Sequence, residues 1–225
     1  LLRRLLAVPD TVARVSDLNA GIYVTLRFLL QSTSLRMISV WNPSFLTILI
    51  DRMHDYADRL LDDLEAGTLQ SPFPLPDGLQ SRLQKQARAQ PQRARILRGQ
   101  LQSEGTLRPK NLWPNLKVIS CWTDAAAKMA LPAVAEQFPG ILLQGKGLLA
   151  SEGVVSIPLI GSAGAALAIT SHFYEFLETE NERPKLAQEL EEGREYSLIL
   201  TTGGGLWRYA LGDRIRVKGF VEHTP

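Results

Sequence analysis

The segment of residues 201–213, TTGGGLWRYALGD, holds the residue types in this chain that are best suited to binding a ligand. Its three consecutive glycines let a backbone approach a ligand closely, because glycine adds no Cβ. Asp213 follows Gly212 at the end of this bend, and its carboxylate can accept two hydrogen bonds of the kind that ribose hydroxyls offer. The spacing alone fits equally well a β-hairpin with a solvent-facing aspartate.

A second candidate group is the triplet Ser151-Glu152-Gly153, which follows a predicted strand over residues 141–144. Open α/β sheets bind ligands beyond the carboxyl ends of their strands. A neighbouring hydroxyl and carboxylate suit a phosphate oxygen and its Mg²⁺. Alone, such a triplet is also typical of a turn. The preceding residues 145–150, GKGLLA, superficially match a dinucleotide fingerprint, but the β-branched continuation with Pro158 excludes the helix that this fingerprint requires.

The other reactive residue types do not cluster along the sequence. Cys121, the only cysteine, has apolar neighbours and is predicted to be a buried, inert thiol. The three histidines are scattered, and His172 is expected to be a hydrogen-bonded residue of a sheet. No group of residues has zinc-ligand spacing. The four tryptophans are expected to belong to the core: Trp41, Trp113, Trp122 and Trp207.

Composition limits the possible partners. The 225 residues carry a formal net charge of +2, so no overall field attracts nucleic acid or a membrane surface. A single cysteine excludes an intramolecular disulfide and favours a cytoplasmic location. The N-terminal residues lack the features of a signal peptide. Residues 153–174 contain no acidic residue, lysine or arginine, but Pro158 and the GSAG cluster at 161–164 interrupt this run. We therefore expect two buried strands there and no membrane span.

Residues 81–102 are basic, with six Lys or Arg residues and no acidic residue. A nucleic-acid surface is one interpretation. A pair of solvated helices separated by Pro91 is preferred, because no aromatic residue interleaves the cations to stack on bases. A nucleic-acid module is thus the least favoured reading, and we expect no nucleic-acid partner.

The order of predicted elements indicates an α/β fold. Residues 1–110 are mainly helical, with one helix from the Asn42-Pro43-Ser44 start to Gly67 and a proline-rich connector at 71–78. A strand at 116–120, a helix at 124–138 that Pro132 starts or kinks, and the strand at 141–144 form a parallel β-α-β layer. A β-rich, barrel-like region follows, with β-structure expected at 154–160, 165–173, 196–200 and 215–221.

Several motifs in this order resemble one known family. They are residues 112–116 (LWPNL) leading to Asp124, then LLASEG, TTGGGLWRYALGD and RVKGF, preceded by residues 38–45. This series resembles the Gretchen Hagen auxin-responsive acyl-acid amido synthetases, in particular the bacterial members. That family belongs to the adenylate-forming superfamily, which includes acyl-CoA synthetases and luciferases. The resemblance covers nearly the whole chain, and the pattern of residues 201–213 is its most specific part.

The resemblance implies roles for individual residues. Glu152 matches the family's Mg²⁺-binding acid, and Ser151 matches a hydroxyl near the α-phosphate of ATP. Asp213 matches the acid that holds the ribose hydroxyls, with Tyr209 and Gly212 in the same nucleotide-binding motif. By a looser correspondence, Thr123, Asp124 and Ala125 lie where the superfamily lines adenine. Two positions depart from the family's pattern, since tyrosine is frequent where Leu148 stands and arginine where Ala210 stands.

The implied reaction has two steps. A carboxylate attacks the α-phosphate of ATP to give an acyl-adenylate and pyrophosphate, and the amine of an amino acid then displaces AMP. The family's phosphate loop and C-terminal lid are absent from these residues, and both ends look cut from something longer. We therefore expect the central part of an adenylating domain, inactive alone. The alternatives are an adenylating ligase with a thiol acceptor and a nucleotide-binding protein without catalysis.

Overall fold

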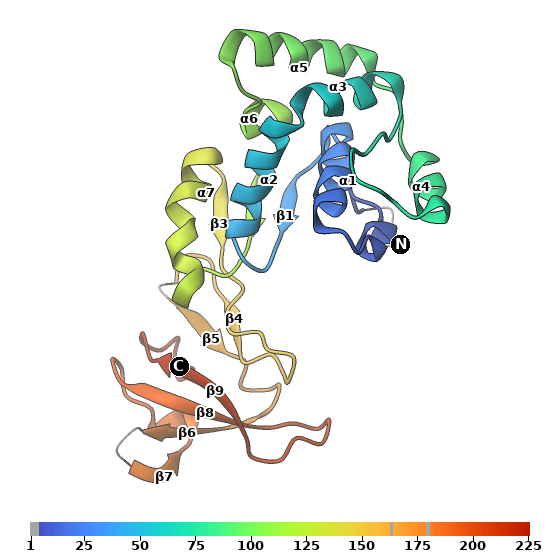
Figure 1. Cartoon of the computed structure of the whole chain (residues 1–225). Helices are drawn as coiled ribbons and strands as arrows, with labels where there is room; N and C mark the ends of the chain where they lie inside the picture. The colour runs from blue at the N-terminus through green and yellow to red at the C-terminus, as the bar shows by residue number, and fades with distance from the viewer. Residues whose placement is uncertain (1–4, 163, 179–180) are drawn as a thin grey trace. The chain divides into compact units, whose positions relative to one another are not determined.

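A computed structural model describes residues 5–162, 164–178 and 181–225 of the chain. The chain divides into two units, Leu1–Leu143 and Gln144–Pro225. The first unit is helical with a small parallel sheet, and the second consists of antiparallel β-structure (Figure 1). The predicted α/β class and the change from helix to strand along the chain are both confirmed.

Several helix ends of the first unit coincide with proline, glycine or a capping side chain. The Asp17 carboxylate accepts a hydrogen bond from the Ala20 amide at 2.7 Å, at the start of α1. Pro91 occupies the first turn of α5, as expected from the split basic segment. Gly67 ends α3 in the left-handed conformation, with φ of 73°. The helices of this part are η2 (Asp10–Arg14), α1 (Leu18–Gln31), α2 (Ser44–Asp55), α3 (Ala57–Ala66), α4 (Asp77–Gln84), α5 (Pro91–Glu104) and α6 (Pro109–Leu112).

The prediction of a single helix between Ser44 and Gly67 is wrong, because the structure has two helices there. Tyr56 separates α2 from α3 with φ of −109° and ψ of 11°, outside helical geometry. Its ring packs edge-on against Tyr23 and Phe73, with centroids 5.8 Å away in each case. These contacts come from distant parts of the chain, so the 3.6-residue periodicity of the leucines continues through the break and does not reveal it.

The sheet of the first unit has the order β1-β2-β3 and is made of β1 (Met37–Ser39), β2 (Val118–Ser120) and β3 (Leu142–Gln144). β1 and β2 are parallel, with Ile38 opposite Ile119. Between β2 and β3 the chain forms η3 (Ala125–Ala130) and α7 (Leu131–Gln137), and Pro132 lies in the first turn of α7. The predicted β-α-β layer is therefore present. β1 was not predicted from periodicity, because three residues are too few to show alternation.

A buried polar group joins the helices of the first unit. The Arg27 side chain is fully buried and donates hydrogen bonds to the carbonyl oxygens of Asp63, Thr68 and Arg88. Burial lowers the pKa of Arg27. The Tyr23 hydroxyl donates to the Asp63 carboxylate at 2.8 Å. α1 thus holds α3 and the loops beside it through the hydrogen bonds of these two buried side chains as well as through the apolar core.

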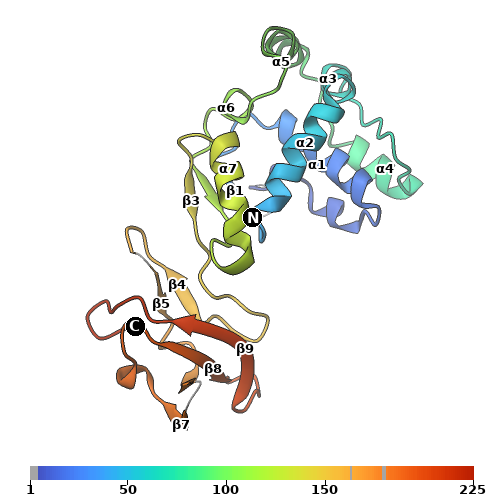
Figure 2. The ribbon, with the colours of Figure 1, turned by 60° about the vertical axis from the view of Figure 1, so that its left-hand side comes forward.

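The second unit contains β4 (Ser156–Pro158) and β5 (Ala165–Leu167) as one antiparallel pair. A four-stranded antiparallel sheet has the order β7-β6-β8-β9, and Figure 2 shows β8 beside β9. Its strands are β6 (Phe173–Glu178), β7 (Asn181–Lys185), β8 (Glu195–Thr201) and β9 (Tyr209–Arg216), with η4 (Ala187–Glu189) after β7. β7 was not predicted. The strand expected at 215–221 is wrong beyond Arg216, where irregular structure begins.

Apolar side chains of the second unit form a core of their own, around Phe176, Tyr196, Leu198 and Leu200. Alternating residues of β8 supply it, since Tyr196, Leu198 and Leu200 point to the same face of the sheet. Among the described residues, no helix is long and apolar enough to cross a membrane.

Candidate functional site

The glycine-rich segment forms the connection between β8 and β9, and both threonines hydrogen-bond within it. The Leu206 amide donates to Thr202 Oγ1 at 3.3 Å, and the Thr202 amide donates to the Leu206 carbonyl at 2.9 Å. The Arg208 amide donates to Thr201 Oγ1 at 3.0 Å. We call residues 202–208 the glycine loop. Its backbone donors are partly satisfied by threonine hydroxyls, which gives a short connection with three glycines a defined shape.

Arg208 closes the glycine loop with an unusual backbone conformation. Its φ is 45°, in the left-handed region that non-glycine residues seldom adopt. The Arg208 Nε donates to Glu175 Oε2 at 3.0 Å. Glu175 lies in β6, and β8 lies between β6 and β9 in the sheet, so this bond reaches across β8. The Glu175 side chain is only 11% exposed, against 52% for Arg208.

Asp213 does not lie at the end of the bend, as the sequence suggested, but inside β9. Ser197 pairs with Arg214 and Ile199 pairs with Ala210, so three residues of β9 stand opposite Leu198 alone. This β-bulge consists of Leu211, Gly212 and Asp213, and Gly212 adopts φ of 85°. Gly212 and Asp213 are exposed. A bulge changes the direction of side chains at its site, so the Gly-Asp pair presents an exposed carboxylate at the position opposite Leu198.

Ser151 and Glu152 lie at the turn of a small hairpin. Leu149 and Val154 form an antiparallel bridge, and the Ala150 amide donates to the Gly153 carbonyl at 3.2 Å. Ser151 Oγ donates to Glu152 Oε2 at 2.8 Å. Residues 145–150 separate this turn from β3. Contrary to expectation, the turn therefore does not directly follow that strand. The dinucleotide reading is excluded as predicted, because β4 and not a helix comes next.

A buried tyrosine of β6 contacts the end of this hairpin. The Tyr174 hydroxyl lies 2.8 Å from the Val154 carbonyl oxygen and 3.1 Å from that of Ala168, and its one proton is shared between them. Burial raises the pKa of Tyr174. His172 packs so close to Gly153 that a Cβ there would lie 2.6 Å from its Nε2. His172 Nδ1 is buried without a hydrogen-bond partner among the described residues, so the expectation of a fully hydrogen-bonded histidine is wrong.

Thr123 and Asp124 lie in the connection from β2 to η3 in the first unit, and Ala125 is the first residue of η3. Thr123 Oγ1 donates to the Asp124 carboxylate at 3.3 Å, and Ala125 adopts φ of 50°. Three tryptophans are not core residues, contrary to expectation: Trp41 is 55%, Trp122 39% and Trp207 81% exposed. Trp41 and Trp122 pack on each other, with centroids 5.4 Å apart, where β1 and β2 end. Trp113 is buried as expected, and so is the Cys121 thiol.

The candidate residues thus fall into three groups. Tyr209, Gly212 and Asp213 lie on β9, Ser151 and Glu152 on the Leu149–Val154 hairpin, and residues 123–125 in the first unit. Within the part of the chain that the structure describes, no hydrogen bond or ion pair joins Glu152 to Asp213. Glu175 and Arg208 were not predicted as functional residues. An acidic residue in the otherwise apolar FYEFL stretch is the signal that points to Glu175.

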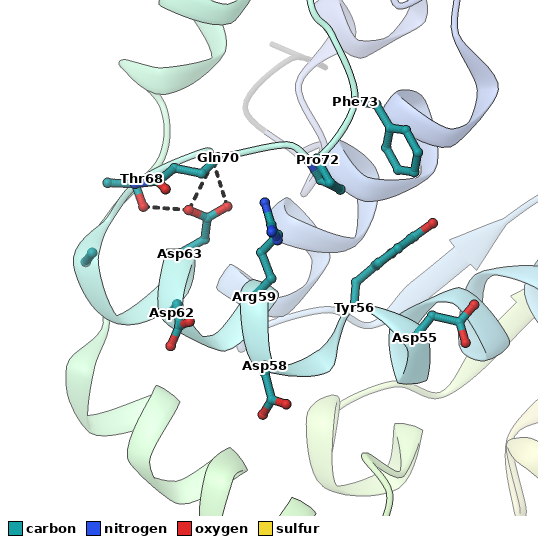
Figure 3. A pocket seen from close by; sticks show the side chains of 11 residues that line it. Asp55, Tyr56, Asp58, Arg59, Asp62, Asp63, Thr68, Gln70, Pro72 and Phe73 are labelled. Atoms are coloured by element: carbon teal, nitrogen blue, oxygen red, sulfur yellow. Dashed lines mark hydrogen bonds between the residues drawn. The ribbon is translucent and has the colours of Figure 1, made fainter.

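An open hollow of about 730 Å³ in the first unit is lined by carboxylates and two aromatic rings (Figure 3). Its most buried acid, Asp63, accepts hydrogen bonds from Thr68 Oγ1 at 2.5 Å and the Gln70 amide at 2.8 Å, and also from Tyr23. Figure 3 shows the Asp63 carboxylate turned toward Thr68 and Gln70, while Asp58 extends away from it. Asp63 therefore holds the helices together and is not available to a ligand.

The basic segment has structural partners for several of its cations. Arg93 donates to the carbonyl oxygens of Leu30 and Leu112, both at 2.7 Å, and burial lowers the pKa of Arg93. Arg98 pairs with Asp62 and Glu65 where α5 packs on α3. These pairings favour the predicted pair of helices over a nucleic-acid surface. Among the described residues, no group of three or more His, Cys, Asp and Glu side chains could hold a metal ion.

Two family descriptions match the chain. The GH3 family N-terminal domain matches residues 1–143, and the GH3 family central domain matches residues 165–225. Curated relatives include the probable indole-3-acetic acid-amido synthetase GH3.6 of Oryza sativa subsp. japonica, 29% identical over 74% of this chain and 38% of that protein. Another is the indole-3-acetic acid-amido synthetase GH3.8 of Oryza sativa subsp. indica, 26% identical over 75% of this chain and 30% of that protein. The chain therefore spans less than half of these relatives.

The fold matches solved structures of the same kind. A structure of GH3.15 acyl acid amido synthetase aligns with a TM-score of 0.82 and 22% identity, covering 98% of this chain and 40% of that one. AtGH3.15 acyl acid amido synthetase in complex with 2,4-DB aligns with a TM-score of 0.81 and 24% identity, covering 93% of this chain and 38% of that one. At these identities the likeness establishes the fold alone.

Proposed function

The chain belongs to the GH3 family, and we propose that it forms the central part of an ATP-dependent synthetase that joins a carboxylic acid to an amino acid. Family membership over residues 1–143 and 165–225 is the observation that carries this proposal. The relatives are named as acid-amido synthetases, which supports the same reaction class. The cytoplasm is the proposed compartment, consistent with a single buried cysteine.

We assign nucleotide binding in the second unit to two segments, β9 and the hairpin that carries Ser151 and Glu152. Asp213 accepts hydrogen bonds from the ribose hydroxyls, a role that its exposed carboxylate on the bulge of β9 supports. Tyr209 and Gly212 shape the same binding edge, Tyr209 as the first residue of β9 and Gly212 through its left-handed backbone. For Thr123, Asp124 and Ala125 of the first unit, a nucleotide-binding role rests on the resemblance to the family's pattern alone.

Ser151 and Glu152 are assigned to the phosphate end of ATP. A hydroxyl and a carboxylate within hydrogen-bond distance of each other are oxygen donors of the kind that Mg²⁺ accepts alongside substrate phosphates. One protein carboxylate suffices, because Mg²⁺ completes its shell with phosphate oxygens and water. Bound there, Mg²⁺ would neutralise phosphate charge. Ser151 Oγ orients the Glu152 carboxylate and can donate to an α-phosphate oxygen instead.

The reaction requires no covalent bond to the protein. The acid's carboxylate oxygen attacks the α-phosphorus of ATP, and pyrophosphate leaves with the electrons of the broken P–O bond. The amine nitrogen then attacks the acyl carbon, AMP leaves, and the amine loses a proton. The chain's residues act by positioning these groups, which is the main source of rate when charged reactants are held in line.

The first test is ATP–pyrophosphate exchange with a panel of carboxylic acids, using the complete reading frame and Mg²⁺. We expect exchange with at least one acid, and Glu152→Ala should reduce it about 100-fold or more, because loss of the metal's protein ligand costs several kcal/mol of barrier stabilisation. Glu192→Ala is the matched control, since Glu192 is an exposed glutamate of the same unit, in the turn before β8.

The outcomes separate the alternatives. Exchange that Glu152→Ala leaves intact would remove the metal role of Glu152. Exchange without amide formation, but with transfer to a thiol, would favour a thiol acceptor. No exchange with any acid, while Mg-ATP still raises the melting temperature, would indicate a nucleotide-binding protein without catalysis.

A further inference from the structure

We propose that Glu175 is a positioning residue for the nucleotide, acting through Arg208 on the glycine loop. This inference rests on the proposed function and adds a residue pair to it. Among the residues that the structure describes, no hydrogen bond or ion pair joins Glu175 to a residue assigned to ATP. Its effect is transmitted because Arg208 is the last residue of the glycine loop and directly precedes Tyr209.

Two hydrogen bonds hold Arg208 in an unusual backbone conformation. Its amide donates to Thr201 Oγ1, its Nε donates to Glu175 Oε2, and its φ of 45° is one that a side-chain-bearing residue keeps only when its surroundings determine it. The two acceptors lie on neighbouring strands, the Thr201 hydroxyl on β8 and the Glu175 carboxylate on β6. The sheet thereby fixes where the glycine loop ends and where β9 begins.

Burial makes the Glu175 bond specific. The Glu175 side chain is 11% exposed, and a carboxylate in such a place requires a charged or hydrogen-bonding partner. Glu175 stands opposite Ile199, which in turn stands opposite Ala210 of β9. The Arg208 side chain therefore reaches over β8 to meet Glu175, and this hydrogen bond ties the end of the glycine loop to β6.

The same hairpin offers a matched control at its other end. Glu195 stands opposite Arg216, and the two form an ion pair with Nε–Oε1 at 3.0 Å. The Arg216 hydrogen bond lowers the pKa of the Glu195 carboxyl. Glu195 joins the same two strands as the glycine loop but is well exposed and distant from it in sequence. Glu175→Gln and Glu195→Gln remove the same charge and change the same number of atoms.

The test combines amide hydrogen exchange with kinetics on the full reading frame. Glu175→Gln should increase exchange at the Leu206 and Arg208 amides about tenfold, the effect of losing one charge-assisted hydrogen bond. It should raise KM for ATP by a similar factor with kcat nearly unchanged, since binding geometry and not chemistry is altered. Glu195→Gln should change neither quantity. If Glu175→Gln folds poorly, Arg208→Lys replaces it in the test. Lysine keeps the positive charge at this half-exposed position but lacks the guanidinium group, so it should give the same increases in amide exchange and in KM for ATP.

Three results would overturn the inference. One is unchanged exchange of the glycine loop in Glu175→Gln and Arg208→Lys. Another is faster loop exchange with an unaltered KM for ATP, which would make the pair structural only. The third is a parent protein without ATP–pyrophosphate exchange or ATP binding, and this result removes the proposed function as well. The first two arise in an active parent, so the two failures are distinguishable.

Discussion

Gly147 illustrates how a single residue can control the position of the Ser151-Glu152 turn. It has φ of 68°, and a Cβ added there would lie 2.6 Å from the Ser156 carbonyl oxygen. Leu148 follows it and binds Ser156 through two contacts: its amide donates to Ser156 Oγ at 2.8 Å, and its carbonyl accepts from the Ser156 amide at 3.2 Å. The hairpin that carries Glu152 therefore begins at a close contact that only glycine permits.

Gly147→Ala should destabilise the second unit by about 2–5 kcal/mol, the sum of left-handed strain and overpacking, and should weaken ATP binding. Gly161→Ala is the control, because Gly161 has φ of 81° but open space around its Cβ position. It should cost only the strain, about 1–2 kcal/mol, and leave ATP binding unchanged. Urea unfolding and the KM for ATP measure the two effects. Equal losses in both variants would show that the Ser156 contact is unimportant.

At the scale of elements, one phenol contributes a pH-dependent part of the connection between α1 and α3. The Tyr23 hydroxyl is buried and donates to Asp63, and burial together with this bond raises the pKa of Tyr23 well above its usual value. A raised folded-state pKa means that the protonated phenol stabilises the fold. That stabilisation is complete below the unfolded-state pKa of about 10 and declines as pH rises beyond it.

Tyr23→Phe should therefore lower the free energy of unfolding by about 1–3 kcal/mol at pH 7, because the Asp63 carboxylate loses a donor. The difference from the parent should shrink above pH 10 by about 1.4 kcal/mol per pH unit. Tyr56→Phe, at a ring that packs on Tyr23, serves as the control and should cost less at pH 7, because no hydrogen bond to Asp63 is removed. Urea denaturation at pH 7 and pH 10.5 provides the measurement. A pH-independent deficit in Tyr23→Phe would contradict the assignment to the phenol.

At the scale of the whole molecule, the buried apolar side chains of the described residues form two clusters. One contains Leu60 and lies within the first unit, and the other contains Phe176 and lies within the second. Each core is built from its own unit's residues, so damage to one core should remain within its unit.

Leu60→Ala should cost about 2–5 kcal/mol and Phe176→Ala about 3–5 kcal/mol, since both side chains are fully buried. Amide hydrogen exchange should show loss of protection in the first unit alone for Leu60→Ala and in the second unit alone for Phe176→Ala. Each variant is the control for the other. Simultaneous loss of protection in both units would mean that they unfold as one cooperative body.

The sequence by itself determined those features that depend on a few neighbouring residues. Pro91 and Gly67 marked helix ends because their backbone limits act locally, and Cys121 was expected in the core from its apolar neighbours. The order of the glycine-rich and Ser-Glu motifs indicated the family and the α/β class. The site roles of Glu152 and Asp213 came from the same motifs, and they remain predictions until adenylation is measured.

Only the tertiary structure decided what depends on residues distant in the sequence. The break at Tyr56 follows from rings of α1 and the connector after α3, and the short strands β1 and β7 exist only through their pairing partners. The bulge that carries Asp213 is defined by its register against β8, and the Arg208–Glu175 bond joins residues 33 positions apart. Such pairings are selected by burial and cross-strand geometry, which no local pattern encodes.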